Sequence, residues 1–306
     1  MILHSISELR AIAAPLVVAA GVFDGVHLGH QTLIRRALEN ARYGDALCLI
    51  LTFDPHPAQL LHPTSALRLL TSTAHKIRLI QQLGAEHILV LSFNAAFAAL
   101  SATEFIHLLS LHVPSLQEIC VGYNWLFGRR REGNVLLLRQ LSTKFGFRVT
   151  EIGAVKIDGK AVSSTRIRDC IQSGDLHSTA KFLGRKYTIL GTVVKGEGRG
   201  HSIGFPTANL ATNELFPPDG VYVVYARVDG IMFPGVTNIG THPTFCLASQ
   251  RILEVYLLDY SGSLYGKDIE VCFEAYLRKE CKFPSPQLLR MQIEQDVRAA
   301  RAILQR

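Results

Sequence analysis

The feature that most restricts the possible folds of the amino half is a regular alternation of short apolar segments with segments of helical periodicity. Four short apolar runs are candidate strands, at 16–21, 46–53, 86–93 and 117–122. Stretches with helical periodicity follow them, at 30–42, 73–83, 102–112 and 135–145. Short, almost wholly apolar runs are typical of strands buried on both faces of a parallel sheet. The alternation therefore predicts a doubly wound α/β domain with right-handed crossovers and ligands at the carboxyl ends of the strands.

The carboxyl part of the chain has a different pattern. Alternating segments rich in β-branched and aromatic residues, separated by turns with glycine or proline, lie at 187–196, 220–230, 252–260 and 268–277. They are typical of a small antiparallel barrel or sandwich. An amphipathic helix is expected within 284–305, starting after Ser285 and Pro286. The change falls near Gly184, so we predict two domains, 1–184 and 185–306.

Composition favours a folded protein without a membrane partner. Hydrophobic residues make up 48% and charged residues 19%, a balance that supports a core rather than disorder. No stretch approaches the roughly 20 apolar residues that span a bilayer. The apolar run at 11–20 follows no basic segment and contains Pro15, so we interpret it as a strand rather than a signal sequence. A cytoplasmic location is expected.

Cysteine usage and charge narrow the classes of partner. The six cysteines are scattered without a CxxC motif, which favours reduced thiols over disulfides or a zinc site. The net charge of +7 favours anionic partners, either nucleic acid or phosphorylated small molecules. Aromatic residues are 8% without a stacking motif, and the arginines form no single stripe, so we expect no nucleic-acid partner.

The segment GVFDGVHLGH at 21–30 is the first candidate site. Its glycines allow a sharp turn and a close approach of the backbone to a ligand; they are Gly21, Gly25 and Gly29. A helix starting near His30 would direct free N–H groups and its positive dipole end at this turn, as in phosphate sites. His27 and His30 could donate hydrogen bonds to phosphate oxygens, or they could simply cap the helix. A metal site is disfavoured because no third ligand lies nearby.

This segment resembles the HxGH signature of the nucleotidyltransferase superfamily, and the longer pattern GxFDGxHxGH is similar to that of bacterial FAD synthetases. Three further segments carry the narrower resemblance: 52–57, 121–134 and 163–176. The resemblance implies a nucleotidyltransferase-like, Rossmann-like parallel-sheet domain that adenylylates FMN. It implies that the turn also binds substrates through Gly21, Phe23, Asp24 and Gly29.

The same resemblance assigns roles beyond the turn. Asn124 would help bind substrate, while Ser164, Thr165 and Arg168 would contact ATP phosphates. Serine and threonine at 163–165 can cap a helix N-terminus, and the planar fork of Arg168 suits phosphate. For Arg129, Arg130 and Arg131, phosphate binding and a solvated basic loop stay equally open.

The implied chemistry requires no nucleophilic side chain. The terminal phosphate of FMN would attack the α-phosphate of ATP and expel pyrophosphate. Catalysis would rest on alignment and on neutralising the charge of the phosphate oxygens. The histidines, the helix terminus, Arg168 and a Mg²⁺ ion would supply that neutralisation.

The segment GEGRGHSIGFPTANL at 196–210 is the second candidate site. On an extended chain the side chains of Thr207 and Asn209 point to one face. Their hydroxyl and amide oxygens can hold Mg²⁺, an ion that keeps few protein ligands and relies on substrate phosphates. An ordinary barrel turn is the alternative for the glycine-rich part.

Together with 235–245 and 264–283, this segment resembles the riboflavin kinase module, a likeness that covers most of 187–300. It implies that Glu254 takes the proton from the 5′-hydroxyl of riboflavin, and partial burial would raise the pKa of a strand carboxylate towards that use. A solvent-facing strand glutamate without a role is the alternative. It implies that Arg278 contacts flavin or nucleotide. The implied loop glycines are Gly196, Gly198, Gly200 and Gly204. His242 stands where arginine is more common in the family, so it receives no role.

The sequence thus predicts an enzyme that converts riboflavin and ATP to FMN and ADP, and FMN and ATP to FAD and pyrophosphate. Three alternatives stay open. One module of the same fold could be degenerate, although signature residues stand in both halves. The chain could be a nucleic-acid-binding protein, or a flavin-binding regulator without turnover. ATP-dependent product formation would separate the enzyme from the regulator.

Overall fold

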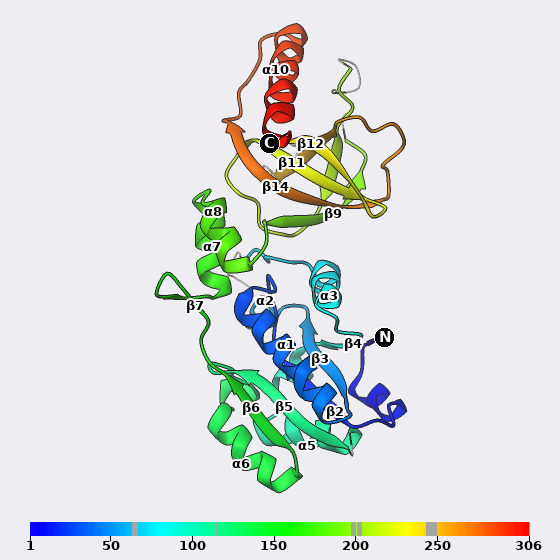
Figure 1. The fold of residues 1–306 in the computed structure, drawn as a ribbon, viewed down its shortest axis with the longest axis vertical. Coiled ribbons are helices and arrows are strands. Elements are labelled where there is room, and N and C mark those ends of the chain that lie inside the picture. Colours follow the sequence, from blue (N-terminus) through cyan, green and yellow to red (C-terminus); the bar gives the residue numbers. More distant parts are fainter. Residues whose placement is uncertain (63–66, 114, 197–199, 201–203, 243–249, 306) are drawn as a thin grey trace. The chain divides into compact units, whose positions relative to one another are not determined.

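The structure, a computed structural model, describes residues 1–62, 67–113, 115–196, 200, 204–242 and 250–305 (Figure 1). The chain divides into two compact units. The first unit contains Met1–Arg68 and Thr73–Ser164, and the second contains Leu69–Ser72 and Thr165–Arg306.

A six-stranded parallel sheet forms the centre of the first unit, in the order β1-β4-β3-β2-β5-β6. Its strands are β1 Ile2–Leu3, β2 Leu16–Ala20, β3 Leu47–Asp54, β4 His87–Ser92, β5 Leu116–Gly122 and β6 Arg148–Ile152. The chain runs from β2 through β3 to β4 and then returns to the other side of β2 with β5. The strand order therefore reverses between β2 and β5, and such a switch point is where open α/β sheets bind ligands.

Helices cover both faces of this sheet (Figure 1). The first pair, α1 Leu28–Tyr43 and α3 Thr73–Gln82, packs on the face that includes Val17 and Ala19 of β2. The second pair, α5 Ala102–His112 and α6 Val135–Phe145, packs on the opposite face with Val18. This arrangement confirms the predicted doubly wound α/β fold.

Short elements complete the first unit without adding to the sheet. They are η1 Ile6–Ala11, α2 Pro57–Leu61, α4 Ala95–Ala98, η2 Arg129–Arg131, β7 Lys156–Ile157 and β8 Lys160–Ala161. β7 and β8 pair with each other as a separate two-stranded sheet.

The second unit is built around a closed antiparallel barrel, in the order β10-β13-β12-β11-β14-β9. Its strands are β9 Thr188–Val194, β10 Ala208–Ala211, β11 Gly220–Val228, β12 Ile231–His242, β13 Gln250–Leu257 and β14 Asp268–Arg278. Helix α10, Pro286–Leu304, starts after its N-cap Ser285 and buries Ala300 against the barrel residues Val221 and Val236. The predicted barrel with a carboxyl-terminal helix is therefore confirmed.

Two helices precede the barrel: α7 Ser164–Gln172 and α8 Leu176–Leu183. Nearly all of α7 and the whole of α8 belong to the second unit. The boundary predicted from the sequence lies later in the chain, between residues 184 and 185. That boundary stays a prediction about which fragment folds independently.

Two further findings bear on the chemistry of the chain. Burial raises the pKa of Cys48 and of Cys272 to about 12, so both thiols stay protonated near neutral pH. No helix among the described residues is both long and apolar enough to cross a membrane.

Candidate active sites

The turn between β2 and α1 has a strained backbone. Phe23 and Val26 have positive φ angles of 54° and 40°. A β-branched residue such as Val26 is an outlier in this region of φ. Such conformations persist only where the surrounding structure holds them in place, and they concentrate at functional sites.

Side chains from outside the turn hold its carbonyl groups. The carbonyl oxygens of Val22, Asp24 and Val26 each accept a hydrogen bond. The donors, in that order, are Thr52 Oγ1 at 3.0 Å, Ser164 Oγ at 2.9 Å and Gln31 Nε2 at 3.0 Å. The turn therefore has one defined conformation, in which Asp24 is buried as well.

The two histidines of the turn stack on each other. Their ring centroids lie 3.6 Å apart with the planes 14° from parallel. His27 is the N-cap of α1, and its Nδ1 accepts the backbone N–H of His30 at 3.3 Å. The neutral His27 ring therefore carries its proton on Nε2, as a hydrogen-bond donor. The fully buried Phe23 meets the His30 ring edge-on, with centroids 5.3 Å apart.

This geometry bears on both interpretations of the histidines. Helix α1 begins at Leu28, two residues before the expected start near His30, because His27 caps it. Capping is thus present, and donation to phosphate stays a prediction. The buried ring of Phe23 supports His30, so any contact of Phe23 with a ligand stays a prediction too.

The other predicted residues of the amino half lie on neighbouring segments. Asn124 is exposed in the turn after β5, and β5 pairs with β2, so both turns leave the same edge of the sheet. The hydroxyl of Ser164 donates a hydrogen bond to the backbone carbonyl of Asp24. Thr165 and Arg168 are grouped with the second unit, and their phosphate contacts stay predictions. Arg129–Arg131 form the exposed turn η2.

Lys76 is a residue that the sequence reasoning missed. It is 5% exposed on α3, and its Nζ donates to the carbonyls of Val22 at 3.3 Å and Phe53 at 3.0 Å. Burial lowers the pKa of its ammonium group to about 8, while the charges of Asp24 and Asp54 oppose that shift. A signal was present in the sequence: Lys76 precedes the apolar Leu79 and Ile80 by three and four residues, which places it on the buried face of the helix.

In the barrel, the predicted base and a predicted metal ligand are direct neighbours. Glu254 of β13 pairs with Asn209 of β10 on one side and with Asn238 of β12 on the other. Side chains opposite each other on antiparallel strands lie about 5 Å apart at Cβ and face the same side. Leu253 and Val255 are fully buried while Glu254 is half-buried, so the three polar side chains lie on the outer face of the barrel wall.

Asn238 was not predicted from the sequence. Its Nδ2 donates to Glu280 at 3.4 Å. Asn238 lies beside Glu254 because of the register in which β12 pairs with β13. That register cannot be predicted from a single sequence.

Two described glycines of the candidate segment, Gly196 and Gly200, lie close to the predicted magnesium ligands. A Cβ added to Gly196 would lie 1.7 Å from Asn209 Nδ2, and one on Gly200 would lie 2.3 Å from the carbonyl of Phe205 and 3.1 Å from Thr207 Oγ1. Only glycine allows the backbone to approach Thr207 and Asn209 this closely. A hydroxyl and an amide within a backbone cradle fit Mg²⁺ that takes its other ligands from phosphates. Of the remaining predicted glycines, Gly204 is exposed and Gly198 lies outside the described residues.

Arg278 has a partner within the protein. Its Nε and Nη2 donate to Asp296 of α10 at 2.9 and 2.7 Å, and its Nη1 donates to the carbonyl of Lys279 at 2.9 Å. These hydrogen bonds raise the pKa of the guanidinium and tie β14 to α10. Its contact with flavin or nucleotide stays a prediction. The side chain of His242 lies outside the described part of the chain.

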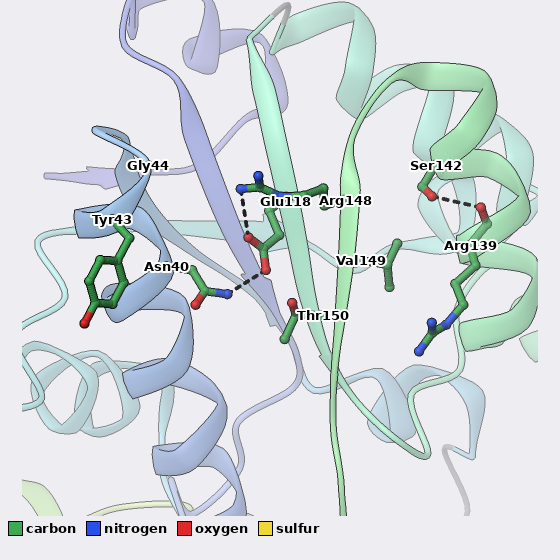
Figure 2. A pocket seen from close by; sticks show the side chains of 9 residues that line it. All are labelled: Asn40, Tyr43, Gly44, Glu118, Arg139, Ser142, Arg148, Val149 and Thr150. Carbon is green, nitrogen blue, oxygen red and sulfur yellow. Dashed lines mark hydrogen bonds and ion pairs between the residues drawn. The ribbon is translucent and has the colours of Figure 1, made fainter.

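Figure 2 shows a pocket of about 720 Å³ elsewhere in the first unit. It is lined by Asn40, Tyr43, Gly44, Glu118, Arg139, Ser142, Arg148, Val149 and Thr150. The buried carboxylate of Glu118 accepts from Asn40 Nδ2 at 2.7 Å and from Arg148 at 3.5 Å. Glu118 and Arg148 stand early in β5 and β6, towards the amino ends of the strands. The pocket is therefore separate from the turn and contains no predicted site residue.

Comparisons with known proteins match both halves of the chain. The family model for FAD synthetase matches residues 9–166, and the model for riboflavin kinase matches residues 183–304. A protein of Bacillus subtilis named bifunctional riboflavin kinase/FMN adenylyltransferase is 37% identical over 97% of this chain and 94% of its own length. A protein of Escherichia coli K12 with the same name is 35% identical over 98% of this chain and 95% of its own length.

A solved structure supports the same fold along the whole chain. A crystal structure from Streptococcus pneumoniae, titled as a macrolide-efflux protein, has a TM-score of 0.83 and 29% identity, and the match covers 98% of both chains. The two family matches cover the segments that contain the two candidate sites. The chain belongs to the family of bifunctional riboflavin kinase/FMN adenylyltransferases.

Proposed function

We propose that the chain makes flavin cofactors in two ATP-dependent steps, one in each unit. The barrel unit phosphorylates riboflavin to FMN and releases ADP, and the α/β unit transfers AMP to FMN to give FAD and pyrophosphate. The observation that carries the proposal is the presence of both family matches in one chain, 9–166 and 183–304. Riboflavin, FMN and ATP are the substrates of this family.

In the kinase step, Glu254 accepts the proton of the 5′-hydroxyl while the hydroxyl oxygen bonds to the γ-phosphorus of ATP. The bond from that phosphorus to ADP breaks, and ADP leaves. Thr207 and Asn209 would hold Mg²⁺ with the phosphate oxygens, and the ion would neutralise phosphate charge during transfer. Support for this assignment comes from the pairing of Glu254 with Asn209 and from the close fit of Gly196 and Gly200 around the two ligands.

In the adenylylation step, a phosphate oxygen of FMN attacks the α-phosphorus of ATP, and the bond to pyrophosphate breaks. His27 donates from Nε2, and His30 and the first N–H groups of α1 add further donors to the charge that develops on the phosphate oxygens. The turn is strained, and its carbonyls at Val22, Asp24 and Val26 accept hydrogen bonds from side chains. This supports the role, because donors that are already in place need no rearrangement during the reaction.

Several finer assignments belong to this proposal. Asn124 would orient FMN, and Ser164, Thr165 and Arg168 would face ATP, with Gly21, Asp24 and Gly29 shaping the turn. Domains at 1–184 and 185–306, a cytoplasmic location and the absence of nucleic-acid and membrane partners are predictions of the same kind.

One chromatographic assay tests the proposed function. Purified protein is incubated with riboflavin, ATP and Mg²⁺, and FMN and FAD are followed over time. FMN should appear first and FAD afterwards, with pyrophosphate released only in the second step. Omitting ATP should abolish both products. Riboflavin that stays unphosphorylated would contradict the kinase assignment, and FMN that yields no FAD would contradict the adenylyltransferase assignment.

A further inference from the structure

Lys76 occupies a position that is unfavourable for a cation. It is the fourth residue of α3, so its charge lies near the positive end of the helix dipole. It is also 5% exposed, and lysine is rarely buried to this degree unless it is paired. Burial lowers the pKa of its ammonium group. A buried group perturbed in this way, beside a candidate active site, indicates a function other than stability.

The ammonium group of Lys76 joins the ends of two neighbouring strands. Its Nζ donates to the carbonyl of Val22, just after β2, and to the carbonyl of Phe53, near the end of β3. Val22 comes directly before the strained Phe23, so this bond fixes the point at which the turn leaves the sheet. Thr52 supplies a second donor to the same carbonyl at 3.0 Å.

We infer that Lys76 is a positioning residue for adenylyl transfer: it clamps the ends of β2 and β3 and thereby holds the turn that carries His27 and His30. This inference rests on the proposed function of the first unit. Lys76 needs no contact with substrate, because it acts through the two carbonyls. The strain at Phe23 and Val26 explains why a clamp is needed, since a turn in a sparsely populated conformation relaxes when its supports are removed.

The first test replaces Lys76 with methionine, which keeps the length of the side chain but removes its charge and donors. We expect kcat for FAD formation from FMN to fall roughly ten- to a hundredfold, the scale of a small misplacement of reacting groups. KM for ATP should change little, and riboflavin phosphorylation should not change. The melting temperature should change little, because the loss of two hydrogen bonds and the removal of a buried cation act in opposite directions. Lys76→Arg, which restores charge and donors, should recover part of the loss.

The second test needs no turnover. Hydrogen exchange of the backbone amides in residues 21–30 should be faster in Lys76→Met than in the wild type. The matched control is Lys144→Met, which removes an exposed lysine from α6 of the same unit. The control should leave exchange in the turn and both activities unchanged.

The outcomes separate the clamp from the proposed function. If the wild-type protein makes no FAD, the proposed adenylylation fails, while hydrogen exchange still tests the clamp. Wild-type FAD synthesis together with an unchanged kcat and unchanged exchange in Lys76→Met would overturn the inference. A joint fall of both activities and of the melting temperature would also overturn it, because Lys76 would then be merely structural.

Discussion

At the scale of single residues, the cap of α1 and the proposed donation to phosphate use different atoms of His27. The cap uses Nδ1 of His27, which accepts the N–H of His30. That bond fixes the tautomer of the neutral ring, so Nε2 carries the proton available for a phosphate oxygen. His30 contributes only its backbone to the cap, and its ring is held between His27 and Phe23. The two histidines should therefore differ in their effect on stability and agree in their effect on catalysis.

His27→Ala and His30→Ala should each lower FAD formation from FMN by roughly ten- to a thousandfold, as for the loss of one preorganised donor. Only His27→Ala removes the cap, at a cost of about 1 kcal/mol in unfolding free energy. Riboflavin phosphorylation should stay near the wild-type rate in both. Melting temperature, FMN formation and FAD formation on one preparation test this. FAD synthesis that survives both substitutions would show that the histidines act only in capping.

The pH dependence of FAD formation should report Lys76. Burial lowers its pKa from 10.5 to about 8, against the opposing charges of Asp24 and Asp54. Between these values the unfolded chain binds the proton and the folded chain does not, so this residue's contribution to stability rises with pH across the window. The clamp loses its charge over the same range. The kcat of FAD formation should therefore fall as pH rises through about 8, and Lys76→Met should lack this descending limb. An identical limb in the variant would assign it to another group.

At the scale of secondary-structure elements, the sequence predicted best where periodicity was strong. The predicted helices at 102–112 and 135–145 match α5 and α6. Strand β12 was missed, because Pro234, Gly235 and Gly240 resemble turn residues. The barrel requires small residues there: a Cβ on Gly235 would lie 2.7 Å from the carbonyl of Tyr256. Contacts of this kind between distant segments cannot be predicted from the local periodicity of the sequence.

The predicted site residues depended on motifs rather than on periodicity. The motifs singled out Asn209 and Glu254, and the structure pairs these two residues across β10 and β13, while their roles stay predictions. Lys76 was missed because it belongs to no recognised motif, and Asn238 was missed because the recognised segment 235–245 gave that residue no role. Each becomes visible only when the fold places it beside another segment.

Substitution of Asn209 tests whether β10, together with the glycine-rich segment beside it, holds Mg²⁺. Asn209→Ala should remove one oxygen ligand of Mg²⁺ and lower riboflavin phosphorylation, and excess Mg²⁺ should recover part of the activity. FAD formation from FMN should be unaffected. Leu210 is the matched control, since its side chain is buried on the other side of the same strand; Leu210→Val should alter stability more than Mg²⁺ dependence. An equal loss of both activities in folded Asn209→Ala would place the kinase site elsewhere.

At the scale of the whole molecule, one short segment from the amino half belongs to the barrel unit. Leu69–Ser72 is grouped with Thr165–Arg306. The backbone N–H of Leu215 donates to the carbonyl of Leu69 at 2.8 Å, and Glu214 Oε1 accepts the N–H of Ser72 at 2.7 Å. The other oxygen of Glu214, which is 1% exposed, accepts the N–H of Leu190 at 3.0 Å. A barrel fragment that starts near 184 therefore lacks one partner of a buried carboxylate.

A comparison of two fragments should show what α7 and α8 contribute to the stability of the second unit. Fragments 165–306 and 185–306 should both phosphorylate riboflavin without making FAD, and the longer one should be more stable because it keeps Phe182 and Leu183, which are buried. A longer fragment that fails to fold would contradict the independence of the second unit.

Glu214→Gln should act differently in the full chain and in the longer fragment. In the full chain the backbone N–H groups of Ser72 and Leu190 each donate to one oxygen of Glu214. The glutamine has only one oxygen, so one of the two N–H groups would face its NH₂ group. The barrel should then lose about 1–3 kcal/mol of stability. In the fragment Ser72 is gone, so the amide can turn its oxygen to Leu190 and the loss should be smaller. Hydrogen exchange of the barrel strands measures the same unit in both proteins. An equal loss in both would mean that the hydrogen bond from Ser72 adds nothing, whereas a difference gives the stability that the amino half of the chain supplies to the kinase unit.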